Sequence, residues 1–595
     1  MFGLASRPMI RISLVGLLCG VSLWAGPLQV RIDHSFGGAP LKAGALCFTN
    51  SAGHELSITR ASYLLSGFAL QNRAGDWIEF TNTFAWIDVA KERNSFEVQG
   101  VPAGNYQRLR FNVGLSSALN HTNPGSFSPA SPLNPNINGL HWSWQGGYVF
   151  LALEGLWKTG QGELSGYSYH LATDSLLMRV EIPVEVAGEG LLTLGFDLMR
   201  LFARQITEDT SSTHSRPGDE LARSLAAAIE TAFVARSFVG CSSRPEEKTQ
   251  SALVARTAKP YRFKIPNYAP KPSLPLDNPL TEEGVALGRR LFNDKSLSVN
   301  GRQSCASCHQ ADAGFVDRGK RVSIGAEGTP GVRNAMSLSN LAWKQSFFCD
   351  GRARTLREQV LMPIENPIEM HESITNVVFK LRSDSEYQQM FADAFGEPEI
   401  NPCRVARAIE QFLLVQTSFN SKFDHALRGE VELSDQEKRG FELFQTEYDP
   451  RRGQLGGDCF HCHGGPLFQS QDFANNGLDS TFSDRGRAEV TGKDTDAGKF
   501  AVPSLRNVAL TAPYMHDGRF KTLEEVIDHY NGGVKRSETL DPNLAKHPHG
   551  GVPLTAADKQ ALVAFLRTLT DSTPLEASRR ASEDNFALHD SLAAQ

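Results

Sequence analysis

Two different periodicities of hydrophobic residues divide the chain. Through residues 28–201, short runs alternate hydrophobic and polar positions between Gly, Pro, Asn and Asp clusters, as in LQVRID, RLRFNVGL, GYVFLALEG and RVEIPVEV. Alternation with period two at this spacing predicts an all-β sandwich or barrel. Residues 217–238, PGDELARSLAAAIETAFVARSF, have hydrophobic residues at helical spacing after an acidic start, which predicts one helix.

Beyond residue 241 the pattern changes to a helical one. The polar stretch SSRPEEKTQSALVARTAKP has few large hydrophobic residues and predicts a linker. The segments LTEEGVALGRRLF, TLREQVLM, RVARAIEQFLLVQTSF, SDQEKRGFELF, TLEEVIDHY and TAADKQALVAFLRTL then carry helix start signals and one hydrophobic face each. The chain is therefore predicted to be multidomain, with an N-terminal all-β sandwich-like domain and a mostly α-helical half.

Composition narrows the class of protein. The 595 residues are 41% hydrophobic and 21% charged, with a formal net charge of -6 and no long basic run. That length suffices for about three to four domains, and the charge balance excludes a nucleic-acid-binding footprint. We therefore expect no nucleic-acid partner.

The N-terminus predicts export. Residues 1–25 contain Arg7 and Arg11, then a hydrophobic run that ends in small residues, which is the layout of a secretory signal peptide. A retained anchor is the alternative interpretation. No later stretch is hydrophobic enough to cross a bilayer, so we expect no membrane span after signal removal and a periplasmic location in a bacterium.

The cysteines carry the strongest chemical signal. Of nine, Cys19 leaves with the signal peptide, and four form the motifs CASCH and CFHCH. In a C-x-x-C-H motif the two thiols attach to haem vinyl groups and the histidine binds the iron. A zinc or redox C-x-x-C is the weaker alternative. The sequence thus predicts two covalently bound c-type haems, held by Cys305, Cys308 and His309, and by Cys459, Cys462 and His463.

Two smaller points on cysteine and histidine follow. Cys47, Cys241, Cys349 and Cys403 remain, and an exported protein could pair some of them, although the sequence does not give the pairing. His461 lies inside the second motif, and we interpret it as a spacer rather than a ligand.

The helical half resembles the bacterial di-haem cytochrome c peroxidase and MauG superfamily. The resemblance is carried by LGRRLFNDKSLSVNGRQSCASCHQ, FFCDGRARTLREQVLMPIENPIEM, GDCFHCHGGPLF and VPSLRNVALTAPYMHDGRFKTLEEVIDHY. It implies tandem cytochrome c domains, the first (263–430) with the peroxidatic haem and the second (431–573) with a six-coordinate haem, followed by a tail (574–595).

The same resemblance implies roles at the open side of each haem. Glu369 and Gln359 match the residues that face the peroxide site, where a carboxylate can take a proton from peroxide and return it to the departing oxygen. At the second haem, peroxidases place a Met and MauG-like enzymes a Tyr, and the matching position is Tyr530. A phenolate favours high-valent iron, so Tyr530 favours an oxidase over simple peroxide removal.

The family also holds a calcium ion between its haems. Asn334, Thr511 and Pro513 match the positions that hold it, and turn residues without an ion are the alternative. One departure concerns the inter-haem tryptophan of the family, because this chain has Cys349 there. Trp343 could replace it only if the loop brings it between the haems.

The N-terminal domain, residues 27–240, resembles the MbnP copper-binding family, and residues 241–262 would link it to the helical half. The resemblance rests on YLLSGFAL, GVPAGNYQRLRFNVGL, HWSWQGGYVFLALEG and YSYHLATD. In that family a MauG-like partner enzyme, MbnH, oxidises a tryptophan to kynurenine, and copper binding depends on this change. The resemblance implies that Trp142 or Trp144 is the substrate here.

Imidazole suits copper, and the histidines of the β domain supply candidate ligands. His34 in the first strand and His170 in YSYH are the best, while His141 and His214 are weaker. His141 adjoins the tryptophans, but alternation along a strand directs its side chain to the opposite face.

Together these features predict an exported di-haem oxidase that uses hydrogen peroxide to oxidise a tryptophan of its own copper-binding domain. A small electron-donor protein is a further possible partner. One alternative is a cytochrome c peroxidase that removes peroxide and carries a copper-binding passenger domain. Another is a non-enzymatic electron-transfer and copper-binding protein.

Overall fold

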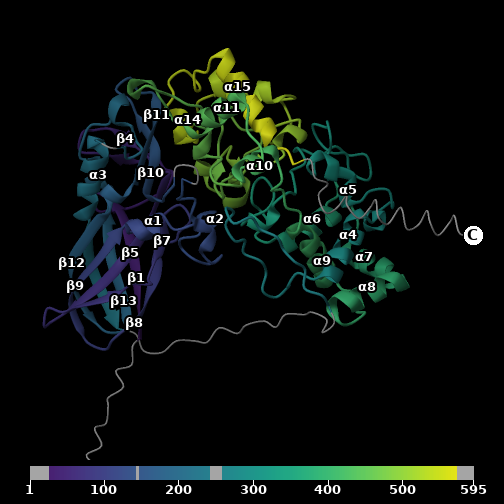
Figure 1. The fold of residues 1–595 in the computed structure, drawn as a ribbon, viewed down its shortest axis with the longest axis horizontal. Coiled ribbons are helices and arrows are strands. Elements are labelled where there is room, and N and C mark those ends of the chain that lie inside the picture. The colour runs from purple at the N-terminus through teal and green to yellow at the C-terminus, as the bar shows by residue number, and fades with distance from the viewer. Residues whose placement is uncertain (1–25, 143–145, 217, 241–257, 572–595) are drawn as a thin grey trace, which may run out of the picture.

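A computed structural model describes residues 26–142, 146–216, 218–240 and 258–571. The predicted signal peptide, Trp144, Cys241, most of the predicted linker and the predicted tail lie outside these residues. Figure 1 shows the β domain on one side and the helical half on the other, with the last helices of the chain next to the β domain. The N-terminal region is sheet-rich and the C-terminal part helical, as the hydrophobic patterns predict.

The β domain is built from two sheets. In the smaller sheet, the strand order is β15 (Phe233–Gly240), β13 (Gly190–Asp197), β1 (Gly26–Phe36) and β2 (Ala39–Pro40), and β8 (Ser95–Val101) pairs with β1. The larger sheet runs in the order β12 (Met178–Ala187), β9 (Asn105–Val113), β5 (Arg60–Asn72), β10 (Val149–Lys158), β11 (Leu164–Ala172) and β14 (Ser212–Thr213). Its remaining strands are β3 (Phe48–Thr49), β4 (Glu55–Leu56), β6 (Trp77–Phe80) and β7 (Ala85–Asp88).

Alternation along the strands explains why the two sheets pack together. In β12 every second residue of MRVEIPVEVA is buried and the others are exposed, so one face of the sheet is hydrophobic. Such faces join in one core that extends from Leu28 to Phe233. The domain is therefore the predicted sandwich.

The helix predicted over 217–238 is shorter than expected. The helix α3 spans Glu220–Glu230, and the chain then forms the strand β15, which pairs antiparallel with β13. The prediction of one helix was wrong beyond Glu230 because the segment FVARSFVG is rich in β-branched and aromatic residues, and Phe233 stacks on Phe196 of β13 at 4.2 Å.

The helical half contains two hydrophobic cores. The first spans Leu280 to Val415 with Leu467, and the second spans Phe423 to Leu569. The helices of the first region are α4 (Glu282–Asn293), α5 (Cys305–Cys308), α6 (Leu356–Glu365), α7 (Ile374–Arg382), α8 (Ser385–Phe395) and α9 (Pro402–Leu414). Those of the second are α10 (Lys422–Leu427), α11 (Asp435–Gln445), α12 (Ala488–Thr491), α13 (Leu523–Asp528), α14 (Pro542–Ala545) and α15 (Ala556–Thr568).

The same close helix contact occurs in both cores. A Cβ added at Gly288 of α4 would lie 1.9 Å from the carbonyl oxygen of Ala408 in α9, and one added at Gly440 of α11 would lie 1.9 Å from that of Ala561 in α15. A glycine thus lets the first long helix of each region approach the last one. This shared contact supports two related haem modules in tandem.

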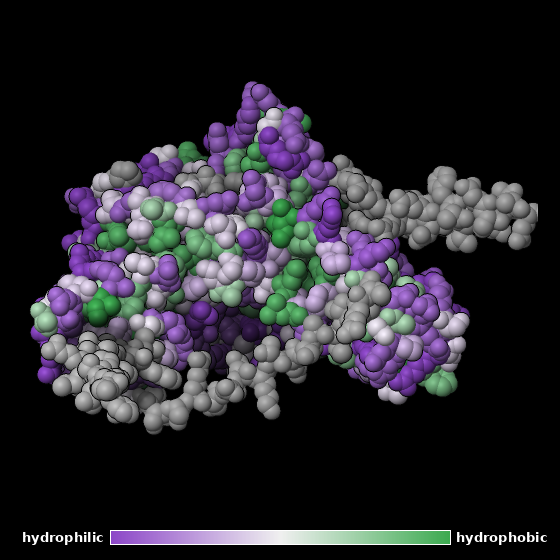
Figure 2. All heavy atoms as spheres, turned by 60° about the horizontal axis from the view of Figure 1, so that its bottom comes forward, coloured by the Kyte–Doolittle hydropathy of each residue, from purple (hydrophilic) through white to green (hydrophobic). Residues whose placement is uncertain are grey.

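The β domain packs on the second of these regions. Leu156 of β10 forms a hydrophobic cluster with Val534, Leu540 and Ala545. The strand β11 lies against α14 so closely that a Cβ at Gly166 would meet the carbonyl oxygen of Pro542 at 1.9 Å. On the face in Figure 2, hydrophobic residues are visible across the middle of the molecule, while the projecting parts at the top and right are mainly hydrophilic.

Candidate active site and domain junction

Both C-x-x-C-H motifs open onto one large cavity in the helical half. It has a volume of about 610 Å³. Its lining includes all six predicted haem-binding residues: Cys305, Cys308, His309, Cys459, Cys462 and His463. The four cysteines form no disulfide, and burial raises the pKa of each thiol, to about 12 for Cys305 and for Cys459. They are therefore neutral thiols in a hydrophobic cavity, available for attachment to haem.

Backbone carbonyls orient the two proximal histidines. His309 Nδ1 lies 2.8 Å from the carbonyl oxygen of Phe315, and His463 Nδ1 lies 3.2 Å from those of Phe468 and Pro503. Burial lowers the pKa of both rings, to about 4 for His463. A neutral imidazole that donates from Nδ1 keeps the lone pair on Nε2 for a metal. Both motifs therefore fit a covalently bound haem whose iron the histidine would hold.

The predicted peroxide-site residues line the same cavity. Gln359 is on α6, and Glu369 follows the end of this helix, where its Oε1 accepts a hydrogen bond of 2.6 Å from Asn366. Burial raises the pKa of Glu369. A partly desolvated carboxyl group with a raised pKa can both accept and return a proton, as general acid–base chemistry requires.

Tyr530 also lines the cavity. It follows α13 in a π-helical turn, His529–Gly533, and its hydroxyl lies 3.4 Å from the amide nitrogen of Asn476. Burial raises the pKa of Tyr530 to about 12, so the side chain is a neutral phenol unless a metal binds it. A π-turn changes the direction of a side chain relative to a regular helix and is frequent at functional sites.

The three predicted calcium residues belong to the cavity wall. Asn334, Thr511 and Pro513 are all lining residues. The amide group of Asn334 donates to the carbonyl oxygens of Lys320 and Arg321, at 3.2 and 3.1 Å, and its backbone N–H donates to His516. The side-chain oxygen of Asn334 therefore stays available as a hard ligand.

Cys349 lines the cavity and Trp343 does not. Burial raises the pKa of Cys349 to about 11, so its thiol is neutral. Trp343 is fully buried between Phe263 and Phe419 and donates to the carbonyl oxygen of Pro270. Since that loop directs Trp343 into the core, it does not replace the inter-haem tryptophan of the family. Cys47 and Cys403 are exposed and unbonded.

The structure does not bring His34 and His170 together. His34, on β1, lies in the sandwich with its Nε2 2.9 Å from the Tyr63 hydroxyl and its ring against Phe196. His170, on β11, alternates with the core residues Tyr169 and Leu171 and so points out of the sandwich. The two histidines are thus separated by the sheet and cannot share one ion.

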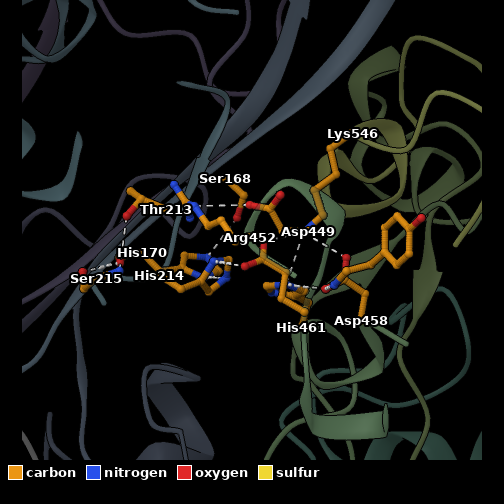
Figure 3. A network of polar contacts seen from close by, with 12 residues as sticks. Ser168, His170, Thr213, His214, Ser215, Asp449, Arg452, Asp458, His461 and Lys546 are labelled. Carbon is orange, nitrogen blue, oxygen red and sulfur yellow. Dashed lines mark hydrogen bonds and ion pairs between the residues drawn. The ribbon is translucent and has the colours of Figure 1, made fainter. Parts of the chain in front are cut away.

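His170 meets two other histidines at the junction of the two halves. One ligand atom each of His170, His214 and His461 lies within 4.8 Å of the others. Figure 3 shows His170 and His214 reaching from the β domain towards His461, Asp458 and Lys546 of the helical half. His461, interpreted from the sequence as a spacer rather than a ligand, is placed by packing at this junction.

Trp142 borders this junction. Its ring stacks on that of His214 with centroids 6.0 Å apart and an angle of 27°. His214 in turn contacts Phe460 at 6.2 Å and His461 at 5.1 Å, both inside the second haem motif. His141 instead packs edge-on against Tyr148. A continuous series of ring contacts thus leads from the second haem motif to one of the two predicted tryptophans.

Sequence patterns did not reveal the acidic residues of the junction. Glu154, Glu447 and Asp458 contact the three histidines, and Lys546 contacts the last two of these acids. They come from segments far apart in the chain, so no spacing connects them. The only available signal was the second histidine inside a C-x-x-C-H motif.

Fold and site define a di-haem c-type cytochrome joined to a β domain. Residues 282–432 match the family described as di-haem cytochrome c peroxidase, and residues 25–216 match the MbnP family. The chain belongs to the di-haem cytochrome c peroxidase and MauG family, and is therefore an oxidoreductase with two c-type haems.

Relatives of known name cover the helical half. The chain is 31% identical over 350 residues to the methylamine utilization protein MauG of Methylophilus methylotrophus, which covers 59% of this chain and 96% of the relative. It is 33% identical over 304 residues to the cytochrome c551 peroxidase of Nitrosomonas europaea, covering 50% and 82%.

Two solved structures match parts of this chain. One is the crystal structure of a MauG-like protein associated with microbial copper homeostasis, with 37% identity, a TM-score of 0.47, and coverage of 54% of this chain and 98% of the other. Another is MbnP from Methylosinus trichosporium, with 18% identity, a TM-score of 0.25, and coverage of 33% and 82%. Among the described residues, no helix is both long and hydrophobic enough to cross a bilayer.

Proposed function

We propose that this chain uses hydrogen peroxide to oxidise Trp142 of its own β domain to kynurenine, and that the change prepares a copper site. The contact that carries the proposal is the stacking of Trp142 on His214, which itself touches Phe460 and His461 of the second haem motif. Aromatic and imidazole rings at these spacings offer a route for oxidising equivalents to leave the cavity. Trp144 is the alternative substrate.

The net reaction balances with peroxide as the only oxidant. Cleavage of the indole C2–C3 bond takes two molecules of hydrogen peroxide, gives two carbonyl groups and releases two molecules of water. Hydrolysis of the N-formyl group then consumes one water, releases formate and leaves kynurenine. The haems, when bound, supply the redox chemistry of peroxide reduction.

The residues of the chain have separate tasks. Glu369 moves the peroxide proton, since it lies in the cavity with a raised pKa, and Gln359 orients peroxide by hydrogen bonding. His309 and His463 would each hold a haem iron, and Tyr530 would supply an oxygen ligand to the second haem, since all three line the cavity. Asn334, with Thr511 and Pro513, holds a calcium ion at the cavity wall.

The tryptophan proposal is tested by peptide mass mapping of the haem-loaded protein before and after peroxide. We expect the mass change of kynurenine on Trp142, its absence in Trp142→Phe, and its persistence in the control Trp77→Phe, whose tryptophan lies under Arg110 away from the junction. Modification of Trp144 alone would reassign the substrate. Unmodified tryptophans with steady peroxide turnover by reduced cytochrome c would contradict the proposal and favour a peroxide-removing enzyme with a passenger domain.

The location and the metal content belong to the same proposal. We expect a periplasmic protein in a bacterium, in keeping with the sequence of residues 1–25 and the covalent haems. Elemental analysis of the purified protein should find calcium, and removing it with a chelator should change the haem spectra, because Asn334 and Thr511 line the haem cavity.

A further inference from the structure

The three histidines at the junction are almost completely enclosed. His170 is on β11, His214 follows β14, and His461 lies between Cys459 and Cys462. Their side chains are 6%, 7% and 2% exposed. Two therefore come from the β domain and one from the second haem motif, and all three lie inside the contact of the two halves (Figure 3).

A carboxylate lies against one nitrogen of each ring. Glu154 Oε1 is 2.7 Å from His170 Nε2, Glu447 Oε2 is 2.8 Å from His214 Nδ1, and Asp458 Oδ1 is 3.3 Å from His461 Nε2. Metal-binding histidines characteristically have a carboxylate or carbonyl on the nitrogen that does not bind the metal, which fixes the tautomer and the orientation of the ring. Each of the three rings faces such a carboxylate, and His461 Nε2 also lies 3.5 Å from Lys546 Nζ.

Two imidazole nitrogens meet at the centre of the cluster. His170 Nδ1 and His214 Nε2 lie 3.1 Å apart. They form a hydrogen bond when one of the two rings carries its proton on this nitrogen, whereas both nitrogens present lone pairs, as two metal ligands would, when each ring donates towards its carboxylate. Two nitrogens bound to one ion at about 2.0–2.1 Å, with an angle of about 109–120° between them, lie about 3.3–3.6 Å apart, so the two rings would separate slightly on binding. Glu447 Oε2 lies 2.8 Å from His214 Nδ1 without a well-aligned hydrogen bond, so this contact does not by itself fix the His214 tautomer.

The charges around the cluster favour a monovalent ion. Glu154, Glu447 and Asp458 carry three negative charges, whereas Arg60, 3.0 Å from Glu154, and Lys546, 2.9 Å from Asp458, carry two positive charges. With the three imidazoles neutral, these five groups leave one negative charge over, and unpaired charge is costly in a buried site. Cu(I) would balance it, and imidazole is a suitable copper ligand.

We propose that His170, His214 and His461 bind one Cu(I) ion, so that the copper site is shared by the β domain and the second haem motif. The choice of copper rests on the proposed function, whereas the three-imidazole site does not. Because His461 is flanked by both haem-attaching cysteines, the copper would sit next to the second haem and join the two halves.

The test is anaerobic titration of the full-length, haem-loaded protein with Cu(I) against a coloured Cu(I) chelator. We expect one tightly bound ion, and at least about tenfold weaker binding in each of His170→Gln, His214→Gln and His461→Gln. The matched control is His547→Gln, because His547 Nε2 lies 2.8 Å from Asp458 in the same network but outside the three-histidine cluster. This control should bind copper as the parent protein does.

X-ray absorption at the copper edge gives a second readout. It should report three nitrogen ligands in the parent protein and two in His461→Gln, and haem content confirms that this variant keeps both haems. If His461→Gln loses its haem, the nitrogen count of the parent protein decides instead.

Three results would overturn the shared site: unchanged affinity in His461→Gln, equal loss in His547→Gln, or two nitrogens in the parent protein. Tighter binding of Zn(II) than of Cu(I) would overturn the assignment to copper. Trp142→Phe separates this inference from the proposed function. Copper binding that depends on His461 in that variant supports the shared site even where no kynurenine forms.

Discussion

Glu369 illustrates how burial prepares a side chain for acid–base chemistry. Burial raises its pKa although Asn366 donates a hydrogen bond to the carboxyl group. A base must be deprotonated to act. Because the pKa of Glu369 is raised, activity should already be lost, as the pH is lowered, at a pH where an ordinary glutamate would still be deprotonated.

We therefore predict that the rate of reaction with peroxide rises with pH through an apparent pKa above about 4.3, the ordinary glutamate value. Glu369→Gln should lower the rate by roughly 10²–10⁴-fold and remove this pH dependence. Stopped-flow measurement of the haem spectrum from pH 4 to 8 checks it. Glu365→Gln, at the end of α6 and outside the cavity lining, is the control. An unchanged pH profile in Glu369→Gln would exclude the assigned role.

Tyr530 gives a second prediction at this scale. Replacing Tyr530 by Phe removes the oxygen ligand, so the spectrum of the second haem should change, its potential should rise, and kynurenine formation should fall. The control Tyr514→Phe removes another cavity hydroxyl, one that donates to the carbonyl oxygen of Val508. Haem spectra and product analysis of both variants test whether Tyr530 binds the iron of the second haem. Normal kynurenine formation in Tyr530→Phe would contradict this role.

At the scale of elements, the two haem regions share the contact of their first and last long helices. The pairs α4–α9 and α11–α15 both meet at a glycine that lies against a carbonyl oxygen of the partner helix. The flanking sequences are too different to be recognised as a repeat. In both regions, however, the two helices lie so close together that the contact position requires a glycine.

A side chain at this glycine should separate the helices. We predict that Gly440→Val destabilises the protein by about 1–3 kcal/mol, because the new Cβ would overlap the carbonyl group of Ala561. Thermal unfolding of the haem-loaded protein measures the effect. Glu442→Ala, on the exposed side of the same helix, should change stability by less than about 0.5 kcal/mol. Similar stabilities of the two variants would mean that the helices can move apart freely.

At the scale of the molecule, the packing of β11 on α14 joins the β domain to the helical half. We predict that Gly166→Val displaces the β domain, because its side chain would overlap the carbonyl group of Pro542. Kynurenine formation should then fall while peroxide still reacts in the cavity. The control Gly160→Ala has open space around it. Product analysis measures kynurenine formation, and peroxide kinetics measure the reaction in the cavity. Unchanged kynurenine formation in Gly166→Val would show that tryptophan oxidation does not require this packing of β11 on α14.

The sequence by itself determined the β domain, the main helices and the two haem-attachment motifs. Period-two and helical patterns predicted the sandwich and the main helices, since each element must bury one face, and C-x-x-C-H predicted both haems, since attachment needs adjacent residues. The strand β15 was missed because its pairing with β13 outweighs the helical spacing before it.

Only the tertiary structure decided which histidines meet. His34 enters the sandwich core, while His170 leaves it and meets His214 and His461. This grouping depends on which face of β11 points outward and on how the β domain lies on α14. Docking of two folded surfaces arises from contacts distant in the chain, and no local pattern of residues encodes it.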